Sequence, residues 1–227
     1  MSRPCFVAFE GIDGSGKTVQ VDMLESLITG DGRSVMKLSF PRYDGGFFGV
    51  EIGRMLADKR HPNAMELNPR DMSLWYALDR FDQMRGWREW DIDFVLLNRF
   101  SLSNMAFQGS RLQSGEDVGE FARWLDELEH VILDLPRPDA YIIFDVSPHQ
   151  SRINVAGKGI REYAGDDADL HERNEDFQAR VRSRYRELAS EMGNVEIVDC
   201  LTVDGAMRTE DDIHIEALGM LRLRGLV

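Results

Sequence analysis

Short runs of apolar residues alternate along the chain with segments in which apolar residues recur every three or four positions. A continuous apolar run is typical of a strand buried on both faces, and the wider spacing is typical of a helix with one apolar face. The predicted strands are 5–9, 34–40, 93–97, 140–144 and 195–198, and the predicted helices are 17–29, 70–88, 118–133, 172–192 and 210–223.

Two of these helices carry additional signals. Asn68 followed by Pro69 is typical of an N-cap and a first helical position, so the second helix is expected to begin there. The helix 172–192 is expected to bury one face, which consists of Phe177, Val181, Tyr185 and Leu188.

The alternation of strand and helix predicts a parallel sheet that is covered on both faces. We therefore expect a three-layer α/β/α fold with a five-stranded parallel sheet, formed as one domain over residues 1–227. The segment 155–170 is rich in glycine and charge, which predicts a mobile loop that acts as a lid.

Composition and charge narrow the function. The chain has 227 residues and a formal net charge of −13, so binding to a nucleic-acid backbone is not expected. Cys5 and Cys200 are too few and too far apart for a disulfide framework or a zinc site, and we expect both to be small buried side chains. The N-terminal apolar run is too short for a signal peptide and no stretch is long enough to span a membrane, which predicts a cytoplasmic protein.

The glycine-rich turn after the first strand matches the phosphate-loop pattern G-x-x-x-x-G-K-[ST]. Its glycines let backbone N–H groups point inward, and the following helix begins with its partial positive charge at the same place. Lys17 is expected to reach the β- and γ-phosphates of ATP, and the Thr18 hydroxyl to bind Mg²⁺. The predicted ATP-binding residues are Gly11, Asp13, Gly14, Ser15, Gly16, Lys17 and Thr18.

A phosphate loop alone leaves a GTPase switch, an ATPase motor or a small-molecule kinase open. The chain has no Asn-Lys-x-Asp segment for reading guanine, and it is too short for the accessory domains of a motor. A kinase needs a second pocket with arginines and aromatic residues. Segments of that kind are present at 40–43, 74–80, 98–109 and 169–172.

The order and spacing of these segments, together with Phe-Glu-Gly-Ile-Asp-Gly-Ser-Gly-Lys-Thr, resemble the thymidylate kinase family over about residues 5 to 200. The resemblance implies a P-loop nucleoside monophosphate kinase that uses ATP and Mg²⁺. The expected reaction converts a deoxypyrimidine monophosphate, foremost dTMP, to the diphosphate. The resemblance also implies nucleotides as the binding partners and a homodimer as the assembly.

Some residues have a chemical reason of their own for an acceptor site. Arg42 follows Pro41 at the carboxyl end of a predicted strand, where ligands bind in open α/β sheets. Tyr76 and Arg80 are four positions apart and share a helix face, which suits stacking on a pyrimidine and donation to its carbonyl. The alternatives are a surface arginine at Arg42 and an amphipathic core helix around Tyr76.

The resemblance assigns roles to these and further positions. Asp13 is expected near the acceptor's 3′-hydroxyl, Arg99 on the transferring phosphoryl oxygens, and Phe107 beside the sugar 2′ position. Lys158 and Arg161 are expected to swing over the triphosphate, with solvated surface charge as the alternative. The predicted catalytic residues are Lys17, Arg99, Asp13, Lys158 and Arg161; the predicted acceptor residues are Asp13, Pro41, Arg42, Tyr43, Tyr76, Arg80, Arg99, Ser103, Asn104, Phe107, Gln108 and Glu172; the predicted metal ligands are Thr18, Asp13, Asn98 and Glu172.

Two positions depart from the family pattern. Asn98 stands where the family has an aspartate near the magnesium, and His171 stands where tyrosine is common. Asparagine keeps an oxygen ligand but removes a charge. Activity is expected to persist with Asp13 and Glu172 holding the metal. The alternatives are a kinase for another or modified pyrimidine nucleotide, and a nucleotide-binding protein with weakened catalysis.

Overall fold

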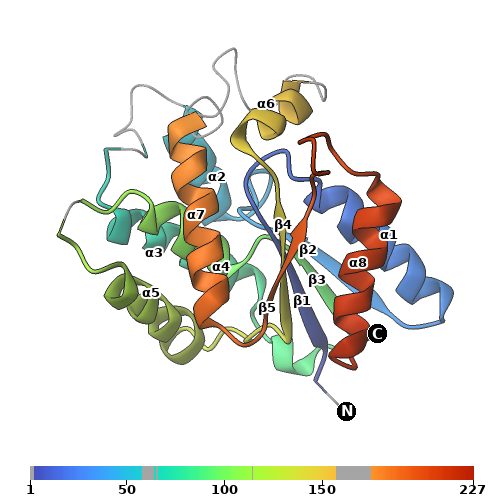
Figure 1. Ribbon diagram of the computed structural model, residues 1–227. Coiled ribbons are helices and arrows are strands. Elements are labelled where there is room, and N and C mark those ends of the chain that lie inside the picture. Colours follow the sequence, from blue (N-terminus) through green and yellow to red (C-terminus); the bar gives the residue numbers. More distant parts are fainter. Residues whose placement is uncertain (1–2, 58–63, 65, 114, 157–174) are drawn as a thin grey trace.

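A five-stranded parallel sheet forms the centre of the molecule (Figure 1). The structure is a computed structural model and describes residues 3–57, 64, 66–113, 115–156 and 175–227. The strand order is β2-β3-β1-β4-β5, and each neighbouring pair is parallel. The strands are β1 (Cys5–Glu10), β2 (Val35–Ser39), β3 (Phe94–Asn98), β4 (Ala140–Asp145) and β5 (Val195–Asp199).

The three central strands have continuous apolar sequences because both of their faces are covered. In the register, Ala8 of β1 lies opposite Leu97 of β3 and Tyr141 of β4. All five strands run in one direction, so the carboxyl ends of β1 and β3 meet at one edge of the sheet. The phosphate loop and Asn98 lie at this edge.

Helices cover the sheet on both sides (Figure 1). One face carries α1 (Lys17–Gly30) and α8 (Glu210–Leu223), and the other carries α4 (Ser101–Gly109) and α7 (Glu175–Glu191). Outside α4 lie α3 (Pro69–Gln83) and α5 (Val118–Glu127), and α2 (Phe47–Ala57) packs on α3. The remaining helical elements are α6 (Pro148–Ala156), the 3₁₀ turn η1 (Trp87–Glu89) and the π-helical turn η2 (Leu128–Ile132).

This architecture confirms the predicted three-layer α/β/α fold, its five strands and the helix 210–223. The N-cap prediction is also confirmed, because the Asn68 side chain accepts a hydrogen bond from Arg70 N at 2.8 Å and Pro69 begins α3. The expected inner face of α7 is buried. Both cysteines are free; Cys200 is buried as expected, whereas Cys5 is only partly buried. Within the described ranges, none of the helices combines the length and apolar character needed to cross a membrane.

Other boundaries were predicted wrongly. The helix expected to reach residue 88 ends at Gln83, and Gly86 then takes a left-handed φ of 69° before η1. The segment expected to be helical over 118–133 is helical from Val118 to Ile132, but from Leu128 on it is π-helical rather than α-helical. Three helices, α2, α4 and α6, were not predicted, and α6 includes the first two residues of the expected lid. The rest of that lid, 157–170, lies outside the described residues.

Candidate active site

The phosphate loop joins β1 to α1 and depends on glycines that no larger residue can replace. Gly11, Gly14 and Gly16 have φ values of 134°, 69° and 89°, in the region that favours glycine. A Cβ on Gly11 would lie 2.6 Å from the carbonyl oxygen of Phe144, and one on Gly14 would lie 2.6 Å from that of Ser151. Both backbone shape and lack of space therefore require glycine at these two positions.

Lys17 is almost fully buried at the first position of α1. Its Nζ donates to the carbonyl oxygens of Gly11 (3.2 Å) and Ile12 (2.8 Å) and to Oγ of Ser15 (3.2 Å). The ammonium group is thus held against the loop itself, beside the backbone that would surround the phosphates. This position agrees with the predicted role of Lys17 as a phosphate ligand.

Helix α6 supports the loop from the far side. Ser151 Oγ donates to the carbonyl oxygen of Asp13 at 2.6 Å, and Asn154 Nδ2 donates to that of Gly14 at 2.9 Å. These bonds give both loop carbonyl groups a hydrogen-bond donor and tie the loop to α6. Neither residue was predicted, because the sequence around them gives no clear helical periodicity and α6 was missed.

Two of the side chains expected to bind magnesium, Thr18 and Asn98, lie next to each other at the loop. Asn98, at the end of β3, donates from Nδ2 to Oγ1 of Thr18 at 3.3 Å. Mg²⁺ prefers oxygen ligands and usually takes few from the protein, the rest coming from water and substrate phosphates. A hydroxyl and a carboxamide at this spacing fit such a site. Among the described residues there is no group of three or more histidine, cysteine, aspartate or glutamate side chains that could hold a metal, and Glu172 lies outside the described residues.

Arg99 connects the loop to the neighbouring helix. Its Nη1 donates to the carbonyl oxygen of Gly11 and to Ser103 Oγ, both at 3.1 Å, and its Nη2 pairs with the carboxylate of Asp13. Its guanidinium also lies 4.9 Å from the ring centre of Phe107. Arg99 has a left-handed φ of 67°, which is unusual for a residue other than glycine and is found most often at functional sites.

Glu10 anchors this constellation from inside the protein. It is completely buried, and it accepts hydrogen bonds from Phe100 N at 2.8 Å, Tyr185 Oη at 2.9 Å and the hydroxyl of Ser103. Burial raises the pKa of its carboxyl group, while these donors and Arg99 oppose that shift. Sequence reasoning did not select Glu10, although a carboxylate at the end of an apolar strand is a signal for such a role.

A buried ion pair between Arg80 and Glu129 lies on the acceptor side. Arg80 of α3 is 2% exposed, and its Nε donates to Glu129 Oε2 at 2.7 Å while Nη2 bonds to Oε1. Asn104 of α4 donates from Nδ2 to the same Oε1 at 3.2 Å. The structure therefore brings two predicted acceptor residues together through Glu129, which sequence reasoning did not find because it lies 49 residues from Arg80.

The remaining predicted acceptor residues differ in how exposed they are. Arg42 and Tyr43 follow β2 after Pro41, and the Arg42 side chain is 55% exposed. Tyr43 and Tyr76 both pack against a small buried cluster between α2 and α3. Gln108 differs, since it is 1% exposed and its Oε1 accepts from Arg111. Lys158, Arg161 and Glu172 lie outside the described residues.

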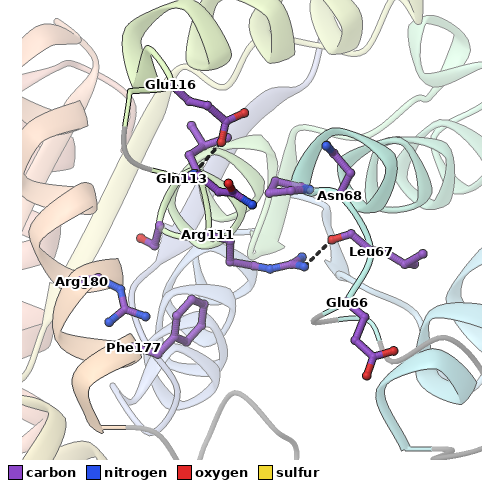
Figure 2. Close-up of a pocket in the computed structure, with 11 residues that line it drawn as sticks. Glu66, Leu67, Asn68, Arg111, Gln113, Glu116, Phe177 and Arg180 are labelled. Atoms are coloured by element: carbon purple, nitrogen blue, oxygen red, sulfur yellow. Dashed lines mark hydrogen bonds between the residues drawn. The ribbon is translucent and has the colours of Figure 1, made fainter.

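Figure 2 shows a pocket of about 830 Å³ beyond the acceptor residues. It lies where the start of α3, the end of α4 and the first turns of α7 meet. Arg111 crosses it and donates to the carbonyl oxygen of Leu67, while Phe177 and Arg180 border it from α7. None of the predicted site residues lines this pocket, but the Phe177 ring is 6.2 Å from that of Phe107, so the pocket begins next to the acceptor side.

Comparisons with known proteins agree with this geometry. The profile of the thymidylate kinase family, described as "Thymidylate kinase", matches residues 9–203. The chain is similar to the thymidylate kinase of Mycobacterium tuberculosis (strain ATCC 25618 / H37Rv), with 31% identity over 192 residues that cover 82% of this chain and 86% of that protein. The thymidylate kinase of Thermosipho melanesiensis is 28% identical over 197 residues, covering 86% and 88%.

A solved structure extends the comparison to the fold. The thymidylate kinase of Candida albicans superposes with a TM-score of 0.71 at 19% identity, covering 100% of this chain and 95% of that one. At this identity the likeness concerns the fold alone. It agrees with a P-loop α/β architecture around the sheet described above.

Proposed function

The chain belongs to the thymidylate kinase family, whose members are nucleoside monophosphate kinases, and on this premise we propose that it transfers the γ-phosphoryl group of ATP to dTMP, giving ADP and dTDP. The observation that carries the proposal is the position of Arg99. Its guanidinium touches Gly11 and Asp13 of the phosphate loop on one side and Ser103 of the acceptor-side helix on the other. An arginine at this junction is close to both nucleotides of a two-substrate site.

In the proposed reaction a phosphate oxygen of dTMP attacks the γ-phosphorus of ATP. The bond from that phosphorus to the β–γ bridging oxygen breaks, and ADP leaves with the electron pair. The loop backbone and Lys17 hold the donor phosphates, and Arg99 stabilises the charge on the transferring group. Binding both substrates in line supplies much of the acceleration, and no covalent enzyme intermediate forms.

Magnesium fits next to the donor phosphates. Thr18 and Asn98 would hold it, with Asp13 and Glu172 as the further predicted ligands. When bound, the ion neutralises phosphate charge. The Asp13 carboxylate pairs with Arg99, and this pairing supports its predicted place facing the acceptor sugar.

The acceptor base is proposed to bind at Tyr76, Arg80 and Asn104. In this proposal the tyrosine ring stacks on the pyrimidine, while Arg80 and Asn104 bond to its edge. Phe107, held beneath the Arg99 guanidinium, would lie near the sugar 2′ position and disfavour ribonucleotides. Arg42 would bind the acceptor phosphate; its exposed side chain at the carboxyl end of β2 supports this role.

Three further parts of the proposal concern the surroundings of the site. Lys158 and Arg161 are proposed to close over the triphosphate, so that water is excluded during transfer. The enzyme is placed in the cytoplasm, where its nucleotide substrates are found. It is proposed to form a homodimer; Phe47, whose side chain is exposed and packs on the partly buried rings of Phe48 and Trp75 with ring centres 5.4–6.5 Å apart, supports such a contact.

A second candidate function follows from Asn98. Without the aspartate that the family pattern has there, the chain would bind nucleotides with little or no turnover, or act on a different pyrimidine nucleotide. The contact of Asn98 with Thr18 favours retained activity, because it holds the carboxamide, which still carries an oxygen ligand, beside the Thr18 hydroxyl.

A coupled assay of ADP release decides between these functions. The purified chain is given ATP and Mg²⁺ with dTMP, dUMP, dCMP, dGMP or AMP in turn, and each acceptor is compared with a reaction lacking acceptor. We expect acceptor-dependent release that is fastest with dTMP. If none of the acceptors raised ADP release above that of the reaction without acceptor, kinase activity would be refuted. A preference for AMP would refute the pyrimidine assignment.

A further inference from the structure

Glu129 lies in the interior between α3 and α4, on the π-helical turn η2. It has no exposed surface, and each of its carboxylate oxygens accepts a hydrogen bond from Arg80. Oε1 also accepts from Asn104 Nδ2 at 3.2 Å. A buried carboxylate is costly unless its charge is paired and its lone pairs are used, and here Arg80 and Asn104 meet both needs.

This arrangement fixes which end of the Asn104 amide points toward Glu129. The amide faces two groups, the carboxylate of Glu129 and the carbonyl oxygen of Ser73, which is 3.1 Å from Nδ2. Both groups are acceptors, so only the NH₂ end can bond to them. The carbonyl oxygen of the amide must therefore point away from Glu129 and Ser73.

That oxygen lacks a partner in the part of the chain that the structure describes. Oδ1 of Asn104 is buried and makes no hydrogen bond there. Leaving a buried acceptor unsatisfied costs about 1–3 kcal/mol. In a protein that binds a ligand, such an atom is a candidate acceptor for a hydrogen-bond donor of that ligand.

We propose that Glu129 is a positioning residue that sets the choice of acceptor base by orienting Asn104 and Arg80. The inference rests on the proposed function and adds the origin of its base selectivity. Glu129 does not touch the base; it acts through the two side chains that do. The π-helical turn agrees with such a role, because single π turns inside helices are frequent at functional sites.

The chemistry of pyrimidines gives the direction of the selectivity. Thymine and uracil carry an N3–H donor beside the O4 carbonyl, whereas cytosine has an acceptor at N3 beside an amino group. An outward carbonyl of Asn104 matches the N3–H. Because Glu129 bonds to Nε and Nη2 of Arg80, the guanidinium is held with Nη1 outside the pair, where it can donate to O4. Cytosine mismatches both groups.

The test replaces the carboxylate by an amide of the same shape, E129Q, and measures kcat and KM for dTMP and dCMP. The side-chain amide introduced by E129Q has an NH₂ group that can donate a hydrogen bond to Asn104 Oδ1. The Asn104 amide is therefore free to turn. We expect the kcat/KM ratio of dTMP over dCMP to fall about tenfold, as expected for one hydrogen bond to the base. The change should lie mainly in KM, since the phosphoryl-transfer residues are untouched.

Two controls separate positioning from a general loss of structure. E127Q removes an exposed carboxylate two residues earlier, and it should leave the ratio unchanged. The second control tests whether Glu129 acts through Asn104. In an N104A background this partner is absent, so E129Q should change the kcat/KM ratio of dTMP over dCMP less than twofold, apart from any change that it causes through Arg80. An E129Q protein that melts lower and loses activity with both acceptors equally, while keeping the wild-type ratio, would overturn the inference.

The unaltered chain provides a test that does not depend on the folding of a variant. N3-methyl dTMP cannot donate from N3, so its kcat/KM should fall at least about tenfold below that of dTMP. Equal use of both nucleotides would overturn the inference but leave the kinase function in place. Absence of turnover with any pyrimidine monophosphate would instead overturn the proposed function, and the inference with it.

Discussion

The two ends of the proposed site are built in different ways. At the donor end, backbone N–H groups and one lysine come from the eight consecutive residues 11–18, and glycines give the loop its shape. At the acceptor end, Arg80 of α3 and Asn104 of α4 converge on Glu129 of η2, so the contacts join side chains from three separate helical elements. The donor end is therefore specified locally, whereas the acceptor end exists only once the helices have packed.

This difference has a functional consequence. A triphosphate presents the same charges whatever the reaction, so a backbone loop of fixed shape is sufficient to bind it. An acceptor base must be distinguished from close analogues by the direction of one or two hydrogen bonds. Buried side chains held by a charged pair provide that direction, because they cannot turn without losing their partners. Mutations at the donor end should lower the rate with every acceptor, and mutations at the acceptor end should change the ranking of acceptors.

The largest effect is expected from Lys17→Ala. The substitution removes the only lysine of the loop and therefore the positive charge that would lie against the donor phosphates. We expect kcat to fall about a thousandfold or more with dTMP and dUMP alike. Steady-state kinetics with both acceptors measure the change. A rate within a few fold of the wild type would show that the loop does not act as proposed.

Lys37→Ala is the matched control for this prediction. Lys37 is on the surface and pairs with Asp22 and Glu25 of α1, so the variant loses a lysine near the same helix without touching the loop. Its kcat should remain close to that of the wild type. Thermal melting of both variants would show whether Lys17→Ala also weakens the fold, since Lys17 bonds to two loop carbonyls.

The same division explains how far the sequence could predict the molecule. The three central strands, β1, β3 and β4, were predicted because they are buried on both faces and therefore have uninterrupted apolar sequences. Helix α4 was missed because nearly all of its residues are buried, which removes the polar face on which the periodicity depends. Helix α6 was missed for another reason, because it carries only a weak apolar stripe.

Residues of the site were easier to predict when the groups that define their role lie close together in the sequence. Lys17 and Thr18 belong to one contiguous motif, and Arg99 was found because the family resemblance marks it. Glu10 and Glu129 were not found, since their roles depend on partners such as Tyr185 and Arg80 that lie far away in the sequence. A carboxylate in an apolar segment indicates that a buried partner exists, but it does not identify the partner.

A smaller effect is expected from Ser151→Ala, which tests whether the donor end is as local as its sequence suggests. The substitution removes the 2.6 Å hydrogen bond to the Asp13 carbonyl oxygen and leaves only Asn154 to support the loop from α6. The KM for ATP should rise about five- to tenfold, the effect of losing one buried hydrogen bond. Titration of ATP at saturating dTMP measures it.

Ser190→Ala is the control for that experiment. Ser190 also donates to a carbonyl oxygen at 2.6 Å, but it lies on the exposed surface of α7. Its KM for ATP should not change. If Ser151→Ala behaved in the same way, the loop would hold its shape without α6, and the contrast between a local donor end and an assembled acceptor end would become stronger.

The smallest effect is expected from Asn98→Asp, the substitution that restores the residue of the family pattern. At present the Asn98 amide donates to the Thr18 hydroxyl at 3.3 Å; a carboxylate would accept a bond from that hydroxyl and add a negative charge for Mg²⁺. We expect kcat to stay the same or rise up to about threefold, and half-maximal activity to need less Mg²⁺. The ranking of dTMP, dUMP and dCMP should not change, because Asn98 belongs to the donor end. A large loss of kcat would mean that the amide itself serves the reaction, and a changed ranking would mean that the two ends are coupled through the residue between them.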